Sequence, residues 1–331
     1  MNTPLKLLPT DLKRVRVDRG NDSPDDAKAL EVIRHVFDKK AIAAVNGALA
    51  AGRPLLVRGE PGVGKTQLAA AVAAQLDRPL VSYTVNARTE SNDLLWTFDA
   101  VQRLAEAQLC GAVQRVEEVA RLRLAEWKFV TPGPLWWGFH WNDAFNHMRK
   151  RIEEGACAAA TVETALRPDR GGNPANGVVV LIDEIDKADT DVPNGLLEAL
   201  GSRCFTPLGC VRVEAQDPMP LVIITTNQER VLPDAFVRRC LVLHVPSPGK
   251  DELIVRGPAH FGDSCQALLE KAADQLLLDR ESASPPRPGL AEYLDLVRAV
   301  LTLSRQQSRD QDELIQEQAE FTFRKQSRER K

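Results

Sequence analysis

The sequence of 331 residues has few features of a disulfide-bonded, metal-binding or membrane-spanning protein. Its six cysteines, at positions 110, 157, 204, 210, 240 and 265, form no C-x-x-C pair and have no histidines at metal-ligand spacing. We therefore expect reduced thiols. No apolar run is long enough to cross a bilayer, and residues 1–20 carry prolines and five basic residues where a signal peptide needs an apolar segment. A cytoplasmic protein without a membrane partner is the expectation.

The chain also has little net charge. Its 43 Lys and Arg residues are offset by 46 Asp and Glu residues, which gives a formal net charge of -3. Proteins dedicated to nucleic acid usually carry a strong positive excess, so this balance argues against DNA or RNA as a partner. The 44% hydrophobic and 27% charged content is typical of a soluble globular protein, and the length allows two ordinary domains or one large domain with a small companion.

One segment carries a complete nucleotide-binding motif, G-x-x-x-x-G-K-[ST]. It consists of Gly59, Glu60, Pro61, Gly62, Val63, Gly64, Lys65 and Thr66. An apolar run of strand length precedes it at residues 54–58, and helix-forming residues follow it from Gln67. In such a loop the backbone N–H groups and the helix N-terminus point at phosphates, Lys65 adds a mobile charge, and the Thr66 hydroxyl suits Mg²⁺. We predict that the loop and Gln67 bind a nucleoside triphosphate with Mg²⁺.

Four further apolar runs are typical of parallel strands that helices cover on both faces. They are residues 79–85, 177–182, 221–226 and 241–245. The third of the five predicted strands ends in Asp183 and Glu184. Asp183 would complete the Mg²⁺ shell beside Thr66, and Glu184 would orient and deprotonate an attacking water. The alternative is a strand that ends in ordinary acidic surface residues.

Asn227 follows the fourth predicted strand directly. A neutral amide at that strand end, beside Asp183 and Glu184, could hold the lytic water or sense the γ-phosphate. The alternative is an asparagine that starts a turn. A segment ending in Arg238 and Arg239 then leads into the fifth predicted strand.

This order of parts resembles the AAA+ ATPases and, within them, the MoxR family. The segments that carry the resemblance are GEPGVGKT at 59–66, VVLIDEIDKAD at 179–189, NGLLEAL at 194–200 and ITTNQERVLPDAFVRRC at 224–240. The similarity extends roughly over residues 30–300. It implies an α/β fold of the P-loop NTPase (AAA+) type, with a five-stranded parallel sheet in the order 5-1-4-3-2, a large helix-2 insertion and a small C-terminal helical lid domain.

The expected domains are an N-terminal extension at 1–29, an AAA+ core at 30–248 with the insertion at about 92–176, a helical lid at 249–307 and a charged, poorly ordered tail at 308–331. A capped helix is expected over residues 24–51. All five tryptophans lie in the insertion, three of them in the cluster at residues 136–141. This cluster either packs the insertion onto the body of the protein or contacts a partner.

Carried over by position, the resemblance makes Asn227 sensor 1 and Arg239 the arginine finger for the γ-phosphate of a neighbouring subunit. Arg238 is the competing candidate, and Arg287, at the start of a lid helix, resembles sensor 2. A guanidinium suits the finger because it stays charged and can bond two phosphate oxygens. A finger that acts on a neighbour implies a ring oligomer, expected to be a hexamer. The family further implies ATP hydrolysis, chaperone-like remodelling of a client and a partner with a von Willebrand A domain.

Two other functions remain as alternatives. An AAA+ motor or loader acting on nucleic acid would bind DNA in a salt-dependent way that stimulates hydrolysis, but the acidic net charge argues against it. An ATP-dependent scaffold with little turnover would bind the nucleotide and scarcely cleave it. The presence of Glu184 and Asn227 argues against the scaffold.

Overall fold

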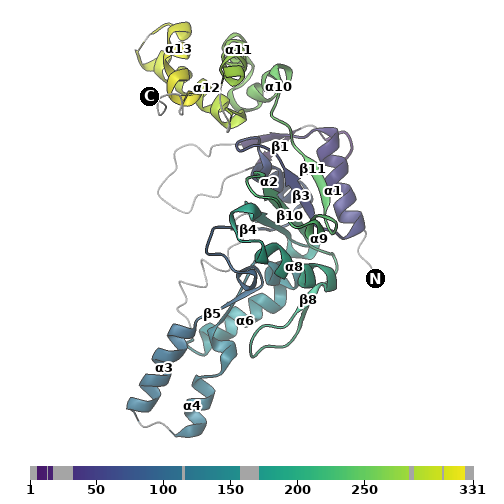
Figure 1. Cartoon of the computed structure of the whole chain (residues 1–331), viewed down its shortest axis with the longest axis vertical. Helices are drawn as coiled ribbons and strands as arrows, with labels where there is room; N and C mark the ends of the chain where they lie inside the picture. Colours follow the sequence, from purple (N-terminus) through teal and green to yellow (C-terminus); the bar gives the residue numbers. More distant parts are fainter. Residues whose placement is uncertain are drawn as a thin grey trace.

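The computed structural model describes residues 6–12, 14–17, 33–113, 116–156, 171–282, 287–307 and 309–324. Its centre is a parallel five-stranded sheet with the order β11-β3-β10-β7-β4 (Figure 1). The strands are β3 (Leu55–Arg58), β4 (Leu80–Thr84), β7 (Val179–Asp183), β10 (Leu221–Thr226) and β11 (Leu241–His244). Numbered along the chain, this order is 5-1-4-3-2, which confirms the predicted sheet.

Helices cover both faces of this sheet, which explains why its strands are apolar throughout. Leu55 and Val57 belong to a core shared with α1 (Lys39–Ala51) and α2 (Lys65–Leu76). Leu56, between them, belongs to the core on the other face. That second core includes side chains of α5 (Pro134–Phe139), α8 (Asp191–Ser202) and α9 (Asp234–Val237). Successive side chains of a strand point to opposite faces, so each strand supplies both cores.

The segment before α1 differs from the expected helix over residues 24–51. Ile33–Val36 form strand β2, which pairs antiparallel with β1 (Arg14–Val17), and the helix begins only at Lys39. The Asp38 carboxylate accepts from the Ala41 N–H at 2.6 Å and caps this helix. The pairing with β1 is a contact between distant residues, so the local apolar pattern did not reveal it. Residues 24–32 of the expected helix lie outside the described residues.

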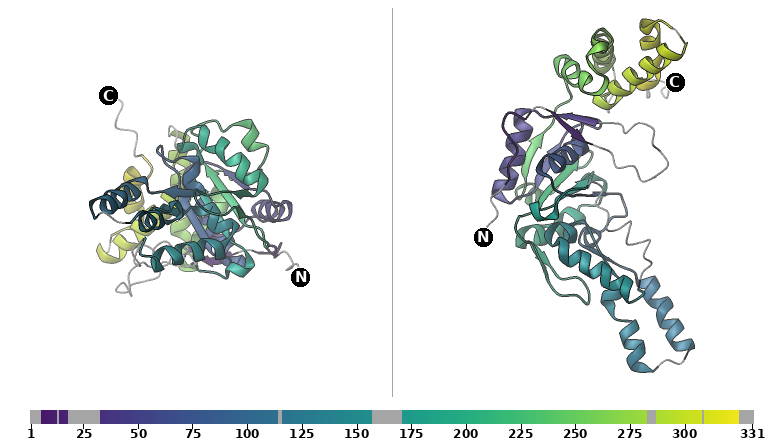
Figure 2. Two further views of the ribbon diagram at one scale, coloured as in Figure 1. Left: turned by 90° about the horizontal axis from the view of Figure 1, so that it is seen from below. Right: turned by 180° about the vertical axis from the view of Figure 1, so that it is seen from behind.

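A helical hairpin projects from the sheet within the predicted insertion. Strand β5 (Trp96–Phe98) pairs antiparallel with β6 (Val130–Pro132) and closes its base. Helices α3 (Ala100–Ala112) and α4 (Glu117–Arg123) extend from this base, away from the C-terminal helices (Figures 1 and 2). The chain returns through α5 and α6 (Trp141–Glu153). A short antiparallel pair, β8 (Cys204–Phe205) and β9 (Val213–Glu214), follows α8.

The C-terminal helices pack around a separate hydrophobic core. They are α10 (Lys250–Phe261), α11 (Gln266–Ser282), α12 (Leu290–Gln307) and α13 (Gln311–Thr322). Of the tail expected to be poorly ordered, residues 325–331 lie outside the described residues, whereas residues 311–322 form helix α13. The reason is that Leu314, Ile315 and Ala319 fall on one helical face and are buried against the other helices. None of the described helices combines the length and apolar composition needed to cross a membrane.

Candidate functional site

The predicted phosphate-binding loop joins β3 to α2, as its motif requires. Gly64 has a φ of 95°, in the left-handed region that favours glycine, and it immediately precedes the first turn of α2. Gly59 lies so close to Val245 that an added Cβ would collide with the Val245 carbonyl oxygen. Of the other loop residues, Val63 is buried, and the Glu60 carboxylate accepts from the Ser247 hydroxyl. Two of the loop glycines are therefore needed for its shape.

Lys65 is buried at the centre of the site. Its ammonium group donates to the carbonyl oxygens of Gly59 and Glu60, each at 2.8 Å, and to Asn227 Oδ1 at 2.7 Å. Burial lowers the pKa of Lys65, and nearby carboxylates, first among them Asp183, oppose that shift. The side chain therefore presents a positive charge held by three oxygen atoms.

Thr66 and Asp183 lie in contact, as predicted for a pair of Mg²⁺ ligands. The Thr66 hydroxyl donates to Asp183 Oδ2 at 2.9 Å. The other carboxylate oxygen, Oδ1, accepts from the hydroxyl of Thr225, and this hydroxyl also accepts from the Glu184 N–H at 2.9 Å. Thr225 thus fixes the orientation of Asp183. Sequence reasoning missed its role, although a hydroxyl at the end of an apolar strand was the available signal.

Glu184 and Asn227 are brought together by the parallel pairing of β7 with β10. Asn227 Nδ2 donates to Glu184 Oε1 at 2.9 Å, while Oδ1 accepts from Lys65. Only this orientation of the amide satisfies both partners. Glu184 has a φ of 59°, a left-handed conformation that costs a non-glycine residue free energy and often marks a functional site. One amide therefore connects the two charged groups.

Asp186 supports this arrangement from beneath the surface. Its side chain is 2% exposed and accepts from two backbone N–H groups, those of Asn227 at 3.3 Å and Glu229 at 2.9 Å. It therefore holds the turn that presents the Asn227 side chain. The sequence gives no sign of this role, because the position of Asp186 two residues after Glu184 does not reveal which way the side chain points.

These side chains line one pocket with the first turn of α12. Its lining consists of Pro61, Gly62, Gly64, Lys65, Thr66, Gln67, Asp183, Glu184, Asn227, Leu290, Ala291 and Leu294. The Ala291 N–H donates to the Gly62 carbonyl oxygen at 3.2 Å, so α12 contacts the phosphate-binding loop directly. Arg287 is exposed, precedes α12 and does not line the pocket.

Arg238 and Arg239 lie outside this pocket. Both are exposed and occupy the turn between α9 and β11. Because β11 runs parallel to β3, with Leu241 opposite Leu55, this turn lies where the strands begin. The phosphate-binding loop lies where β3 ends, about 13 Å away along a four-residue strand. The structure therefore separates the two arginines from the pocket of their own chain.

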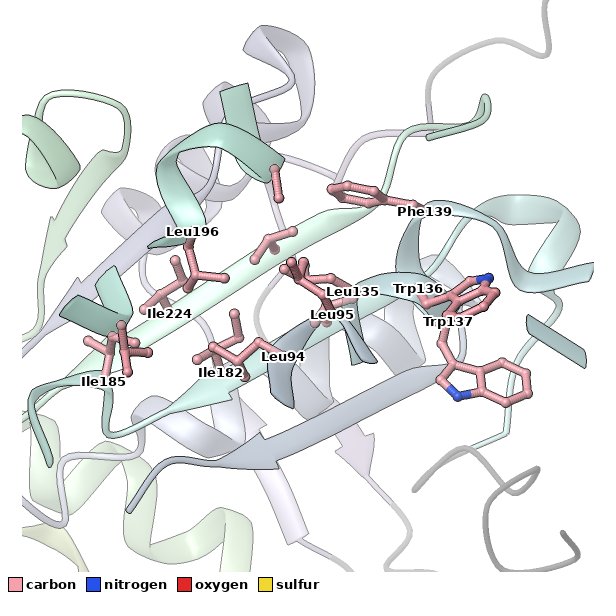
Figure 3. Close-up of a cluster of buried hydrophobic side chains, with 14 of the residues drawn as sticks. Leu94, Leu95, Leu135, Trp136, Trp137, Phe139, Ile182, Ile185, Leu196 and Ile224 are labelled. Carbon is pink, nitrogen blue, oxygen red and sulfur yellow. The ribbon is translucent and has the colours of Figure 1, made fainter. Parts of the chain in front are cut away.

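The tryptophan cluster belongs to the core. Trp136 and Trp137 are 1% and 5% exposed, and they pack with Leu135, Phe139 and residues of β7 and β10 (Figure 3). Trp136 Nε1 also donates to Asp143 Oδ2 at 2.8 Å. The packing interpretation is therefore confirmed for these two residues, and the interpretation as a partner-contacting loop is wrong for them.

Comparisons with known proteins extend these observations. No curated protein matches the chain. Two solved structures of Thermotoga maritima RuvB are similar to it at 15% sequence identity. One is a proline-to-glycine mutant, with a TM-score of 0.46 and coverage of 86% of this chain and 68% of that chain. The other is described as the RuvB Holliday junction branch migration motor, with a TM-score of 0.42 and coverage of 86% and 67%.

A family match covers residues 54–240, from the residue before β3 to the residue before β11. It therefore contains the phosphate-binding loop, Asp183, Glu184, Asn227 and the Arg238–Arg239 turn. The matching family is described as "AAA domain (dynein-related subfamily)". Since the match spans more than half of the sequence, the chain belongs to the dynein-related subfamily of AAA domains.

Proposed function

We propose that this chain is an Mg²⁺-dependent ATPase. The observation that carries the proposal is that one pocket gathers two hydrogen-bonded groups of side chains: Thr66 bonds Asp183, and Asn227 bonds both Lys65 and Glu184. These are the groups that phosphoryl transfer to water requires, namely a phosphate-binding cation, ligands for Mg²⁺, a base and a polar group that positions water. Gln67, beside them, completes the wall of the pocket.

Thr66 and Asp183 fit a magnesium ion because both offer hard oxygen atoms at the same point of the pocket, 2.9 Å apart. Mg²⁺ bound there with the nucleotide would neutralise phosphate charge. Thr225 keeps the Asp183 carboxylate oriented, since its hydroxyl donates to the second oxygen.

In the proposed reaction, Glu184 accepts a proton from the attacking water while the new bond forms between its oxygen and the γ-phosphorus. The bond between the γ-phosphorus and the bridging oxygen breaks, leaving ADP and inorganic phosphate. Asn227 holds the Glu184 carboxylate through its amide N–H and keeps Lys65 in place through its carbonyl oxygen. Charge develops on the transferred group, and Lys65 stabilises it.

A second subunit would complete this site. We assign the arginine finger to Arg239, with Arg238 as the alternative, because both are exposed at the edge of the sheet opposite to their own pocket. Head-to-tail contacts of this kind close into rings, and a hexamer is the expected size. Arg287, exposed just before α12, is proposed as sensor 2, reaching the nucleotide when the lid helices move.

We further propose that a MoxR-like ring couples hydrolysis to the remodelling of a partner protein, such as one with a von Willebrand A domain. Support comes from the α3–α4 hairpin, on which seven large apolar side chains are exposed. They are Val101, Leu104, Leu109, Val113, Val116, Val119 and Leu122. A hairpin on which exposed apolar side chains gather in this number is typical of protein-binding sites.

Two measurements test these proposals. Glu184→Gln should lower the rate of ATP hydrolysis by roughly 10²- to 10⁴-fold, the usual contribution of a general base. The same variant, loaded with ATP, should retain a partner protein that is lost when Leu104 and Leu122 are changed to Ser. Leu278→Ser, which alters an exposed leucine of α11, is the control and should retain the partner.

The alternatives predict other results. Hydrolysis that is stimulated by DNA, and DNA binding that weakens steeply with salt, would favour a nucleic-acid motor. Equally slow hydrolysis by the wild-type protein and the Glu184→Gln variant would favour an ATP-dependent scaffold.

A further inference from the structure

Arg53 contacts the turn that carries both candidate fingers. Its Nε donates to the carbonyl oxygen of Arg239 at 3.1 Å, and its Nη2 donates to the carbonyl oxygen of Arg238. A single guanidinium thus bonds two successive backbone carbonyls from a position 185 residues earlier in the chain. The rigid, planar fork of arginine suits such a two-point contact.

The backbone at Arg53 is itself fixed. Helix α1 ends at Gly52, which has a φ of 57°, and the Arg53 N–H donates to the Ala48 carbonyl at 3.1 Å. This pattern is the usual hydrogen-bonded end of a helix. Two residues later β3 begins at Leu55, which lies opposite Leu241 of β11. Arg53 and Arg239 therefore occupy equivalent places, two residues before paired positions of neighbouring strands.

The turn after α9 is hydrogen-bonded at both ends of each finger residue. Helix α9 is a single turn, Asp234–Val237, and the carbonyl groups of Asp234 and Phe236 accept from the N–H groups of Arg238 and Arg239 at 2.9 and 3.0 Å. Arg53 supplies donors to two of the carbonyls that follow. The Arg238 and Arg239 side chains remain exposed, and none of the ion pairs among the described residues includes Arg53, Arg238 or Arg239. This edge therefore presents guanidinium groups to an anion outside the chain.

We propose that Arg53 is a positioning residue for the arginine finger. By holding the backbone of Arg238 and Arg239, it directs their side chains toward the triphosphate bound by the adjacent subunit. The proposal rests on the proposed function, because it requires a site that two subunits share. Arg53 should therefore affect hydrolysis in the neighbouring subunit and should have no effect on nucleotide binding in its own subunit.

Mixing of variants tests this directly. Arg53→Ala should bind ATP within about twofold of the wild type but lower its hydrolysis rate by roughly tenfold or more, since small misplacements of a catalytic group are costly. Glu184→Gln subunits lack the base but keep a well-placed finger. In an equimolar mixture, about half of the sites belong to Arg53→Ala subunits and keep the base. If heterologous contacts form at random, about half of these sites face a finger from a Glu184→Gln subunit. The hydrolysis rate per total subunit should therefore rise to about one quarter of the wild-type rate.

Controls separate positioning from stability. Arg103→Ala removes a similar bond, from its Nε to the Leu124 carbonyl at 3.2 Å, but far from the strand edge, so its hydrolysis rate should equal that of the wild type. Arg53→Lys keeps one donor and should give a rate between those of Arg53→Ala and the wild type. Where Arg53→Ala does not fold, Arg53→Lys is carried through the same mixing experiment.

The outcomes distinguish the proposals. A wild-type rate for Arg53→Ala and Arg53→Lys, together with a large loss for Arg239→Ala, overturns the role of Arg53 alone. If the hydrolysis rate of Arg53→Ala is low and mixing with Glu184→Gln does not raise it, the positioning role of Arg53 is also overturned, because the effect then lies within the subunit. Absence of ATP hydrolysis by the wild-type protein overturns the proposed function and this inference with it.

Discussion

The buried carboxylate of Asp186 provides a quantitative test of how the site is held. Asp186→Ala removes the acceptor for two backbone N–H groups, those of Asn227 at 3.3 Å and Glu229 at 2.9 Å. A hydrogen bond to a charged group contributes about 1.5–3 kcal/mol to stability. The longer of these two bonds should contribute no more than the lower end of that range. We expect the free energy of unfolding to fall by about 3 kcal/mol.

The effect on hydrolysis should accompany the loss of stability. Once released from Asp186, the turn no longer fixes Asn227 between Lys65 and Glu184, and the rate should fall by roughly 10- to 100-fold. Urea unfolding, followed by tryptophan fluorescence, measures the first quantity, and steady-state phosphate release measures the second. Asp186→Asn, which keeps one acceptor oxygen, should give smaller changes in both.

Asp189 is the matched control for Asp186. Its side chain is 85% exposed and forms an ion pair with Arg230 at 3.4 Å. Exposed ion pairs contribute little, so Asp189→Ala should change stability by no more than about 0.5 kcal/mol and leave hydrolysis unchanged. If Asp186→Ala were as mild as Asp189→Ala, the reasoning about the buried carboxylate would be refuted.

Three further predictions concern the described structure more widely. Trp136→Ala should destabilise the fold by about 3–5 kcal/mol and Trp141→Ala by less, measured by urea unfolding followed by circular dichroism; near-equal small effects would contradict the core assignment. Leu314→Ala should lower the free energy of unfolding by about 2–5 kcal/mol, whereas Phe321→Ala, at an exposed position, should leave it almost unchanged. The comparison tests whether α13 is packed against the other C-terminal helices. Burial lowers the pKa of His35 to about 4, so this residue stays neutral in the folded state while the unfolded chain takes up a proton near pH 6.5. Stability should therefore fall by up to about 2 kcal/mol from pH 7 to pH 5, and a pH dependence that persists unchanged in His35→Gln would contradict this cause.

The sheet and the centre of the site could be predicted because their signals are local. The phosphate-binding loop occupies eight consecutive residues, and each strand is an apolar run with polar residues at its end. Parallel strands bring their carboxyl ends to one edge, so Asp183, Glu184 and Asn227 were expected near Lys65 once the fold was assigned. The structure places them there.

Other features depend on contacts that no local pattern records. Strand β2 exists because it pairs with β1, and the residues of β2 by themselves also suit a helix. Thr225 and Asp186 act through the direction of their side chains, which is set by the twist of the strands and the turns that follow them. The contact of Arg53 with the turn at Arg238 and Arg239 spans 185 residues along the chain and arises from the adjacency of β3 and β11.

Nucleotide binding and turnover, measured side by side, give the sharpest test of the proposed ATPase. Bound ATP and released phosphate would be measured in parallel, on the same preparations, for the wild-type protein and for Glu184→Gln and Lys65→Ala. We expect Glu184→Gln to bind ATP as the wild type does but scarcely to release phosphate, and Lys65→Ala to lose both. Equal phosphate release by the wild type and Glu184→Gln would contradict the proposed ATPase.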